Sequence, residues 1–138
     1  MSTSSPAPAA GIHELFAQIG FGEARREGDE LVVELPAAPH VVNTRGGIQG
    51  GLIATLIDVV AGQHVVDGRA PDDGAVTSDM NIRYLRPVTA GSAHARSRII
   101  HDGRRSVVVQ VDVYATDSMK LAAVATVNFA NVNPERRR

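Results

Sequence analysis

Residues 46–66 read GGIQGGLIATLIDVVAGQHVV, and this stretch decides the fold. From residue 50 onward the side chains are apolar on nearly every face, interrupted only by Thr55, Asp58, Gln63 and His64. A helix that is apolar all round must be covered by the rest of the protein, because water would otherwise meet its hydrophobic surface. The stretch therefore predicts one buried central helix of about four to five turns.

Strand-like segments surround this helix on the chain. Before it, residues 12–19 have the apolar spacing of a short amphipathic helix, and residues 22–36 are typical of a hairpin whose turn is at 25–29. After it, turn signals separate four strand-like segments, at 75–85, 92–101, 106–115 and 121–130. Strands and helices do not alternate, which argues against a Rossmann-type sheet. We expect an α+β protein: an antiparallel sheet, made of the hairpin and a four-strand meander, wrapped around the central helix.

The length of 138 residues fits a single domain. We expect it to span residues 12–132, with a disordered leader at 1–11 and a solvated tail at 133–138. The leader lacks the basic start and apolar run of a secretory signal. No uncharged apolar run approaches the roughly 18 residues of a membrane span. We therefore expect a cytoplasmic protein with no membrane partner.

The composition excludes several classes of function. A formal net charge of -1 gives no electrostatic argument for a nucleic-acid partner. The chain has no cysteine, which excludes disulfides, thiolate nucleophiles and iron–sulfur clusters. Its five histidines show no paired spacing typical of metal ligands. We expect neither a metal nor a resident cofactor.

Two features of the central stretch can carry chemistry. Four glycines within residues 46–51 expose backbone N–H groups at a helix N-terminus, where negative charge such as that of an oxyanion is favoured. Asp58 lies among apolar residues, where an ionised carboxylate is costly unless it is hydrogen-bonded or lines a wet cleft. The alternatives are that the glycines only permit tight turns and that Asp58 marks a solvated stripe. Gly51, Thr55 and Gly62 share that stripe, and small neighbours suit a cleft or a close helix crossing.

The spacing of these features predicts a dimer. Gly50 and Asp58 are eight residues apart, which is about 12 Å along one helix. One carbonyl group cannot touch both. A site that uses both groups therefore needs two chains with antiparallel helices side by side.

Two motifs resemble one known family. Residues 43–51, Asn-Thr-Arg-Gly-Gly-Ile-Gln-Gly-Gly, with Asp58 on the helix, resemble the central segment of the PaaI-type hotdog-fold thioesterases. Residues 76–87, Val-Thr-Ser-Asp-Met-Asn-Ile-Arg-Tyr-Leu-Arg-Pro, resemble the strand that follows in that family. The resemblance covers roughly residues 31–131. It implies a hotdog fold and hydrolysis of a small or medium acyl- or aryl-CoA, with coenzyme A as part of the substrate, at the interface of a homodimer that is commonly part of a tetramer.

The resemblance implies a role for each matched residue. Asp58 takes the position of the general base or nucleophile, and Gly50 that of the amide that polarises the thioester carbonyl. Asn43 matches a polar group near the carbonyl or the attacking water, and Thr77 matches the residue that holds the water or the carboxylate. Gln49 stands where the family usually has histidine; it can donate a hydrogen bond but cannot titrate near neutral pH. The resemblance implies that Asn43 and Gly50 of one subunit act together with Asp58 and Thr77 of the other.

Coenzyme A would be bound by a second set of residues: Gly51, Arg86, Arg104, Arg105 and Ser106. Arginine forks suit phosphate groups, although arginines in a hairpin turn are often only solvated. Two other functions stay open, a non-catalytic acyl-CoA binding domain and a hotdog dehydratase or hydratase. Asp58 argues against the first, because a binder gains nothing from a carboxylate beside a thioester. Gln49 weakens the second, because that chemistry usually needs a histidine.

Overall fold

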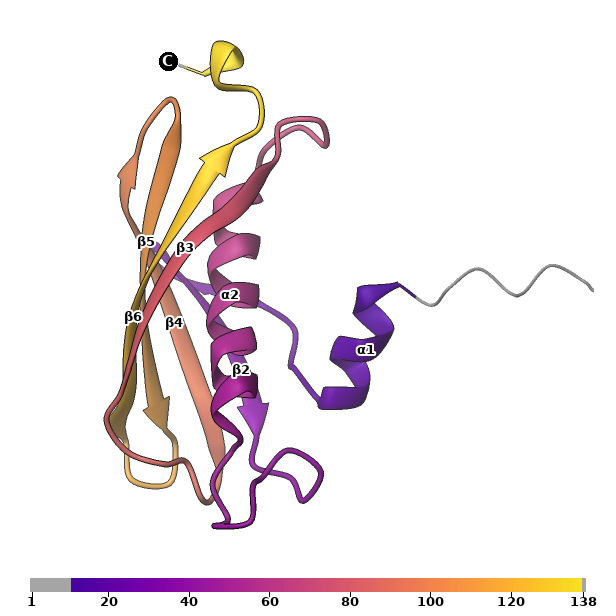
Figure 1. The fold of residues 1–138 in the computed structure, drawn as a ribbon, viewed down its shortest axis with the longest axis vertical. Coiled ribbons are helices and arrows are strands. Elements are labelled where there is room, and N and C mark those ends of the chain that lie inside the picture. Colours follow the sequence, from indigo (N-terminus) through magenta and orange to yellow (C-terminus); the bar gives the residue numbers. More distant parts are fainter. Residues whose placement is uncertain (1–10, 138) are drawn as a thin grey trace, which may run out of the picture.

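The computed structural model describes residues 11–137, in which one antiparallel sheet packs against one long helix (Figure 1). Its elements in chain order are α1 (Ile12–Ile19), β1 (Arg25–Glu27), β2 (Glu30–Pro36), α2 (Gly50–Val66), β3 (Ala75–Tyr84), β4 (Ser92–Asp102), β5 (Ser106–Ala115), β6 (Lys120–Asn131) and a 3-10 turn (Pro134–Arg136). Both predicted helices begin and end at the observed residues. The α+β hotdog architecture predicted from the sequence is confirmed.

The order of the strands corrects the predicted meander. The sheet has the order β1-β2-β4-β5-β6-β3, so only β4, β5 and β6 form a meander, and β3 pairs with β6 at the sheet edge. The chain leaves β2, crosses the face of the sheet as α2, and enters β3 at the far edge (Figure 1). This crossing leaves the place beside β2 open for β4. In the first hairpin, residues 25–27 form a strand rather than the predicted turn, and Gly28, with a φ of 65°, makes the turn.

The core lies between the sheet and α2. Alternate residues of β5, namely Val107, Val109, Val111 and Val113, are fully buried, and each valine buried in this way contributes about 1.5–3 kcal/mol. Facing them, α2 buries Ile53, Leu56, Ile57, Val60, Ala61 and Val65. The composition predicted a helix that the rest of the chain covers on every side. Within one chain this is wrong, because one sheet can cover only part of the circumference of the helix. Gly51 is exposed, and Thr55, Asp58 and Gly62 are partly exposed.

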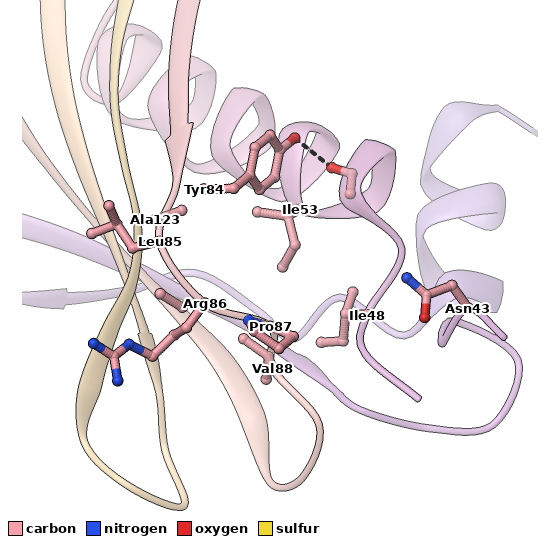
Figure 2. Close-up of a pocket in the computed structure, with 11 residues that line it drawn as sticks. Asn43, Ile48, Ile53, Tyr84, Leu85, Arg86, Pro87, Val88 and Ala123 are labelled. Atoms are coloured by element: carbon pink, nitrogen blue, oxygen red, sulfur yellow. Dashed lines mark hydrogen bonds between the residues drawn. The ribbon is translucent and has the colours of Figure 1, made fainter. Parts of the chain in front are cut away.

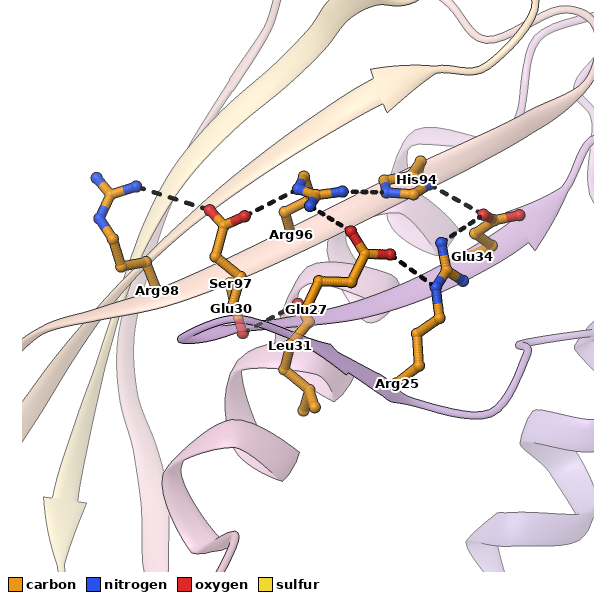
Figure 3. Close-up of polar contacts among 9 residues, drawn as sticks. All are labelled: Arg25, Glu27, Glu30, Leu31, Glu34, His94, Arg96, Ser97 and Arg98. Carbon is orange, nitrogen blue, oxygen red and sulfur yellow. Dashed lines mark hydrogen bonds and ion pairs between the residues drawn. The ribbon is translucent and has the colours of Figure 1, made fainter.

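A network of charged side chains lies on the face of the sheet opposite α2 (Figure 3). Arg96 binds Glu27 at 2.6 Å and Glu30 at 3.0 Å, and Arg25 binds Glu27 at 2.9 Å. Val32 lies between Arg25 and Arg96 in the strand register and is fully buried although it is not part of the α2 core. Single ion pairs of this exposure are weak, but a network over an apolar side chain fixes β1 and β2 onto β4.

Residues 133–137 differ from the solvated tail that we expected. Pro134–Arg136 form a 3-10 turn, and the guanidinium of Arg137 lies 3.0 Å from Asp73 and 3.1 Å from Asp102. The end of β6 brings the chain between the two segments that carry these carboxylates, so Arg137 is held there. The predicted leader falls almost entirely on residues 1–10, outside the described part of the chain. Within residues 11–137, no helix is long and apolar enough to cross a membrane.

A buried pair joins the last turns of α2 to β4. His64 is 6% exposed, and its Nδ1 atom lies 2.6 Å from Oγ of Ser97, which is fully buried. Burial, together with the nearby charge of Arg26, lowers the pKa of His64 from its ordinary value of 6.5. The folded protein therefore favours the neutral imidazole.

This burial predicts a loss of stability in mild acid. Because the pKa of His64 is lower in the folded than in the unfolded chain, its contribution is present above pH 6.5 and is lost as the pH falls below that value. Between pH 7 and pH 5, the melting temperature of the wild type should fall further than that of His64→Gln, by on the order of a few degrees. The exposed His13→Gln is the control, and the slope of its melting temperature against pH should equal that of the wild type. Equal slopes for all three proteins would contradict the prediction.

Candidate functional site

The loop before α2 is held by the side chain of Asn43. Its Oδ1 atom accepts hydrogen bonds from the backbone N–H groups of Arg45 at 2.9 Å and Gly47 at 3.2 Å. Gly46 between them has a φ of 85°, a left-handed conformation that favours glycine. The Nδ2 group of Asn43 makes no hydrogen bond to any described residue. Asn43 thus shapes the loop through Oδ1, and its Nδ2 group is available as a donor.

The first turn of α2 presents two free backbone donors. Gln49 is the N-cap, and its Oε1 atom accepts a hydrogen bond from the N–H of Leu52 at 2.9 Å. Within the described chain, the N–H groups of Gly50 and Gly51 have no acceptor. Gln49 therefore caps the helix. This role was not predicted from the sequence, which showed only that Gln49 replaces the usual histidine of the family. Two adjacent free N–H groups at a helix N-terminus suit a developing oxyanion.

Neither backbone conformation nor packing within the described chain requires a glycine at position 50. Its backbone is not left-handed, and a Cβ atom there would lie 3.7 Å from the ring of Tyr84, an ordinary contact. Glycine loses more backbone freedom than alanine when it is fixed in a helix. Close approach by a group from outside the chain is a physical reason for its use.

Asp58 and Thr77 meet, as the resemblance implied. Thr77 on β3 donates a hydrogen bond from Oγ1 to Oδ1 of Asp58 at 2.7 Å. Asp58 is partly exposed on the open stripe of α2. The hydrogen bond fixes the carboxylate through Oδ1 and leaves Oδ2 available to a water molecule or a ligand.

A cavity of about 370 Å³ opens beside Gly50 (Figure 2). Its lining is mostly apolar and consists of Asn43, Ile48, Gly50, Ile53, Tyr84, Leu85, Arg86, Pro87, Val88, Ala122 and Ala123. Of these residues only Arg86 is charged. Its Nε atom donates to the carbonyl of Leu121 at 3.0 Å, and its guanidinium points away from the cavity (Figure 2). The cavity is suited to an uncharged group.

Tyr84 is a site residue to which the sequence analysis gave no role. Its hydroxyl donates to the carbonyl oxygen of Gly50 at 2.7 Å (Figure 2). It is one of only two tyrosines in the chain and ends the strand that contains Thr77. An aromatic residue at the end of a strand that carries a site residue was the available signal, but its contact with α2 depends on how the sheet folds.

The structure places the predicted residues at three positions along α2 within one chain. Gly50, Asn43 and Arg86 surround the cavity at the N-terminal end of α2, whereas Asp58 lies eight residues further, about 12 Å along the helix. Arg104, Arg105 and Ser106 are at the β4–β5 turn, near the C-terminal end of α2 (Figure 1). In one chain they cannot share a phosphate group with Arg86. Among residues 11–137 no cluster of three metal-ligating side chains occurs.

Comparison with known proteins identifies a family. Residues 46–122, more than half of the chain, match the thioesterase superfamily. An acyl-coenzyme A thioesterase from Mus musculus, THEM4, is 29% identical over 98 residues, which are 70% of this chain and 41% of that protein. This chain therefore aligns with less than half of the length of THEM4.

Solved structures agree with this result. The thioesterase HI1161 from Haemophilus influenzae superposes with a TM-score of 0.80 at 21% identity over 94% of both chains, which shows the shared fold. The protein BH2602 from Bacillus halodurans, whose structure was determined with CoA, is 35% identical, with a TM-score of 0.70 over 73% of this chain and 66% of that one. The chain belongs to the thioesterase superfamily and is a hotdog-fold thioester hydrolase.

Proposed function

We propose that this protein hydrolyses small or medium acyl- or aryl-CoA thioesters to the free acid and coenzyme A. The observation that carries the proposal is the layout of α2: two free glycine N–H groups at its start and a carboxylate held by Thr77 on its open stripe. The similarity to a protein solved with CoA and to an acyl-coenzyme A thioesterase supports coenzyme A as the leaving group. The mostly apolar cavity supports an uncharged acyl group.

In the general-base route, Asp58 removes a proton from a water molecule whose oxygen attacks the thioester carbon. The carbonyl oxygen becomes an oxyanion that the N–H groups of Gly50 and Gly51 stabilise. The carbon–sulfur bond then breaks, the acid forms, and the proton passes from Asp58 to the departing thiolate. In the nucleophilic route, Oδ2 of Asp58 attacks the thioester carbon, the carbon–sulfur bond breaks, and the coenzyme A thiolate leaves. Water then hydrolyses the resulting mixed anhydride, which releases the acid, restores the Asp58 carboxylate and provides a proton for the thiolate. Both routes use the same groups.

A second copy of the chain completes the site. The strand β3 is an edge strand of ten residues, most of them exposed on both faces, and such an edge is suited to pairing with another strand. The open stripe of α2 is built from Gly51, Thr55, Asp58 and Gly62, which allow a second helix to approach closely. Antiparallel pairing brings Gly50 of one chain toward the Asp58 of its partner. A tetramer would join two such dimers.

The test is to incubate the protein with a panel of acyl-CoA thioesters that differ in chain length and in aromatic content. The rate of hydrolysis is measured by the release of free thiol. We expect saturable turnover with a preference among uncharged acyl groups. Binding of CoA without turnover would instead favour the acyl-CoA binding domain. Loss of an unsaturated acyl-CoA by hydration, without release of thiol, would favour the hydratase.

We expect Arg104 and Arg105 to affect substrate binding separately from the chemical step. In the antiparallel dimer the β4–β5 turn of one chain lies at the same end as the N-terminus of its partner's α2, where coenzyme A leaves the site. Replacing both arginines by alanine should raise KM about tenfold and change kcat less than about twofold, because phosphate contacts are equal in the ground and transition states. High salt should reduce the difference.

The matched control is the double change Arg25→Ala and Arg98→Ala, which removes the same charge from β1 and β4, and a thermal melt shows whether this variant keeps the fold. Its KM should stay near that of the wild type. An unaltered KM for the Arg104 and Arg105 variant would show that these arginines are only solvated.

A further inference from the structure

The hydroxyl of Tyr84 joins the edge strand to the first residue of α2. Its bond to the Gly50 carbonyl is 2.7 Å long, although the residue is 54% exposed (Figure 2). The start of the helix is already held by other contacts. Gln49 caps it, Asn43 shapes the preceding loop, and Thr55 donates to the carbonyl of Gly51 at 2.8 Å. The hydrogen bond of Tyr84 is therefore not needed to begin the helix.

This bond acts on the peptide unit that contains the second free donor. The carbonyl of Gly50 and the N–H of Gly51 belong to one planar trans peptide, so they point in opposite directions. Fixing the carbonyl oxygen from β3 fixes the direction of the Gly51 N–H. A donor on the carbonyl also polarises the amide and strengthens the N–H as a donor. The Gly51 N–H has no acceptor among the described residues, so this strengthening is available to a ligand.

The ring of the same residue forms part of the cavity wall. It lies 3.7 Å from the place of a Cβ atom on Gly50, and it lines the cavity together with Ile53 and Leu85. A thioester whose carbonyl oxygen meets the glycine N–H groups has its acyl group beside this ring. The hydroxyl and the ring thus address two different parts of one substrate.

We propose that Tyr84 is a positioning and specificity residue, whose hydroxyl orients the Gly50–Gly51 peptide toward the oxyanion and whose ring limits the acyl group beside it. This inference rests on the proposed thioester hydrolysis. It assigns no proton transfer to Tyr84 and requires no contact between its hydroxyl and the substrate.

The hydroxyl is tested by Tyr84→Phe, assayed with a short-chain acyl-CoA. We expect kcat to fall about tenfold, which is less than the hundredfold or greater loss typical of deleting an oxyanion donor, because the N–H remains but is less well oriented. KM and the preference for acyl length should stay near those of the wild type. Tyr114→Phe is the matched control, because Tyr114 is the other tyrosine and lies on β5 outside the cavity.

The ring is tested by Tyr84→Leu, compared with Tyr84→Phe rather than with the wild type, since both lack the hydroxyl. We expect kcat/KM for the larger acyl groups of the panel to rise at least about threefold relative to the shortest, because leucine leaves more of the cavity open. Light scattering and thermal melts show whether either variant has lost its assembly or its fold.

The outcomes separate this inference from the function on which it depends. If the wild type hydrolyses no member of the panel, the proposed function is wrong. If the wild type is active and Tyr84→Phe keeps its full kcat, the role of the hydroxyl is wrong. If the leucine and phenylalanine variants have the same acyl profile, the role of the ring is wrong. An equal loss in Tyr114→Phe would show that the effect is not specific to the site.

Discussion

Replacing Asp58 by asparagine should lower kcat for acyl-CoA hydrolysis by about a thousandfold, because the amide can neither accept a proton from water nor attack the thioester carbon. The variant is nearly isosteric, and its Oδ1 atom can still accept the hydrogen bond of Thr77. The fold and KM should therefore change little. The measurement is thiol release under saturating substrate, together with a thermal melt.

Thr77→Ala is the companion variant. Thr77 orients the carboxylate without taking part in bond formation, so its loss should lower kcat only about tenfold. Turnover of Asp58→Asn within tenfold of the wild type would remove Asp58 from the mechanism. Equal losses in the two variants would require a direct chemical role for Thr77.

The second large effect concerns the shared site. Gly50→Pro deletes one N–H group with little change to the helix, since proline is well tolerated at the first helical position. Gln49 before it has a φ of -58° and a ψ of 134°, the extended conformation that a following proline favours. We expect kcat of this variant to fall a hundredfold or more, as for the loss of an oxyanion donor.

Mixing two inactive proteins should then restore activity. After subunit exchange between Gly50→Pro and Asp58→Asn chains, each mixed dimer has one site with both lesions and one site with neither. Random pairing of equal amounts leaves about a quarter of all sites intact, so about a quarter of wild-type activity should reappear. The recovery should follow the appearance of mixed dimers in native mass spectrometry.

Two controls accompany the mixture. Each variant exchanged with itself should stay inactive, and a chain that carries both changes should restore nothing when mixed with Asp58→Asn. If complete exchange restores no activity, or if a dilute monomer is fully active, Gly50 and Asp58 do not act on one carbonyl across two subunits.

Much of the fold was predictable because its signals are local. The bounds of α1 and α2 follow from runs of apolar residues that end at turn formers, and the bounds of β4 and β5 follow from alternation between tight turns. The place of β3 was not predictable in this way. Whether β3 pairs with β4 or β6 depends on where α2 crosses the sheet, and residues far apart in the chain decide that crossing.

The candidate site also has a part that the sequence determined and a part that depended on the tertiary structure. The amino-acid sequence by itself determined that Asp58 lies on the helix begun by Gly50, and that their separation of about 12 Å prevents one carbonyl from meeting both in one chain, because the rise of a helix is fixed by its backbone. Only the tertiary structure decided that Tyr84 holds the Gly50 carbonyl, that His64 meets Ser97, and that Arg86 and Arg104 lie at opposite ends of α2. The two hydrogen bonds join residues 34 and 33 positions apart, and they depend on the curvature and strand order of the sheet, which local periodicity does not specify.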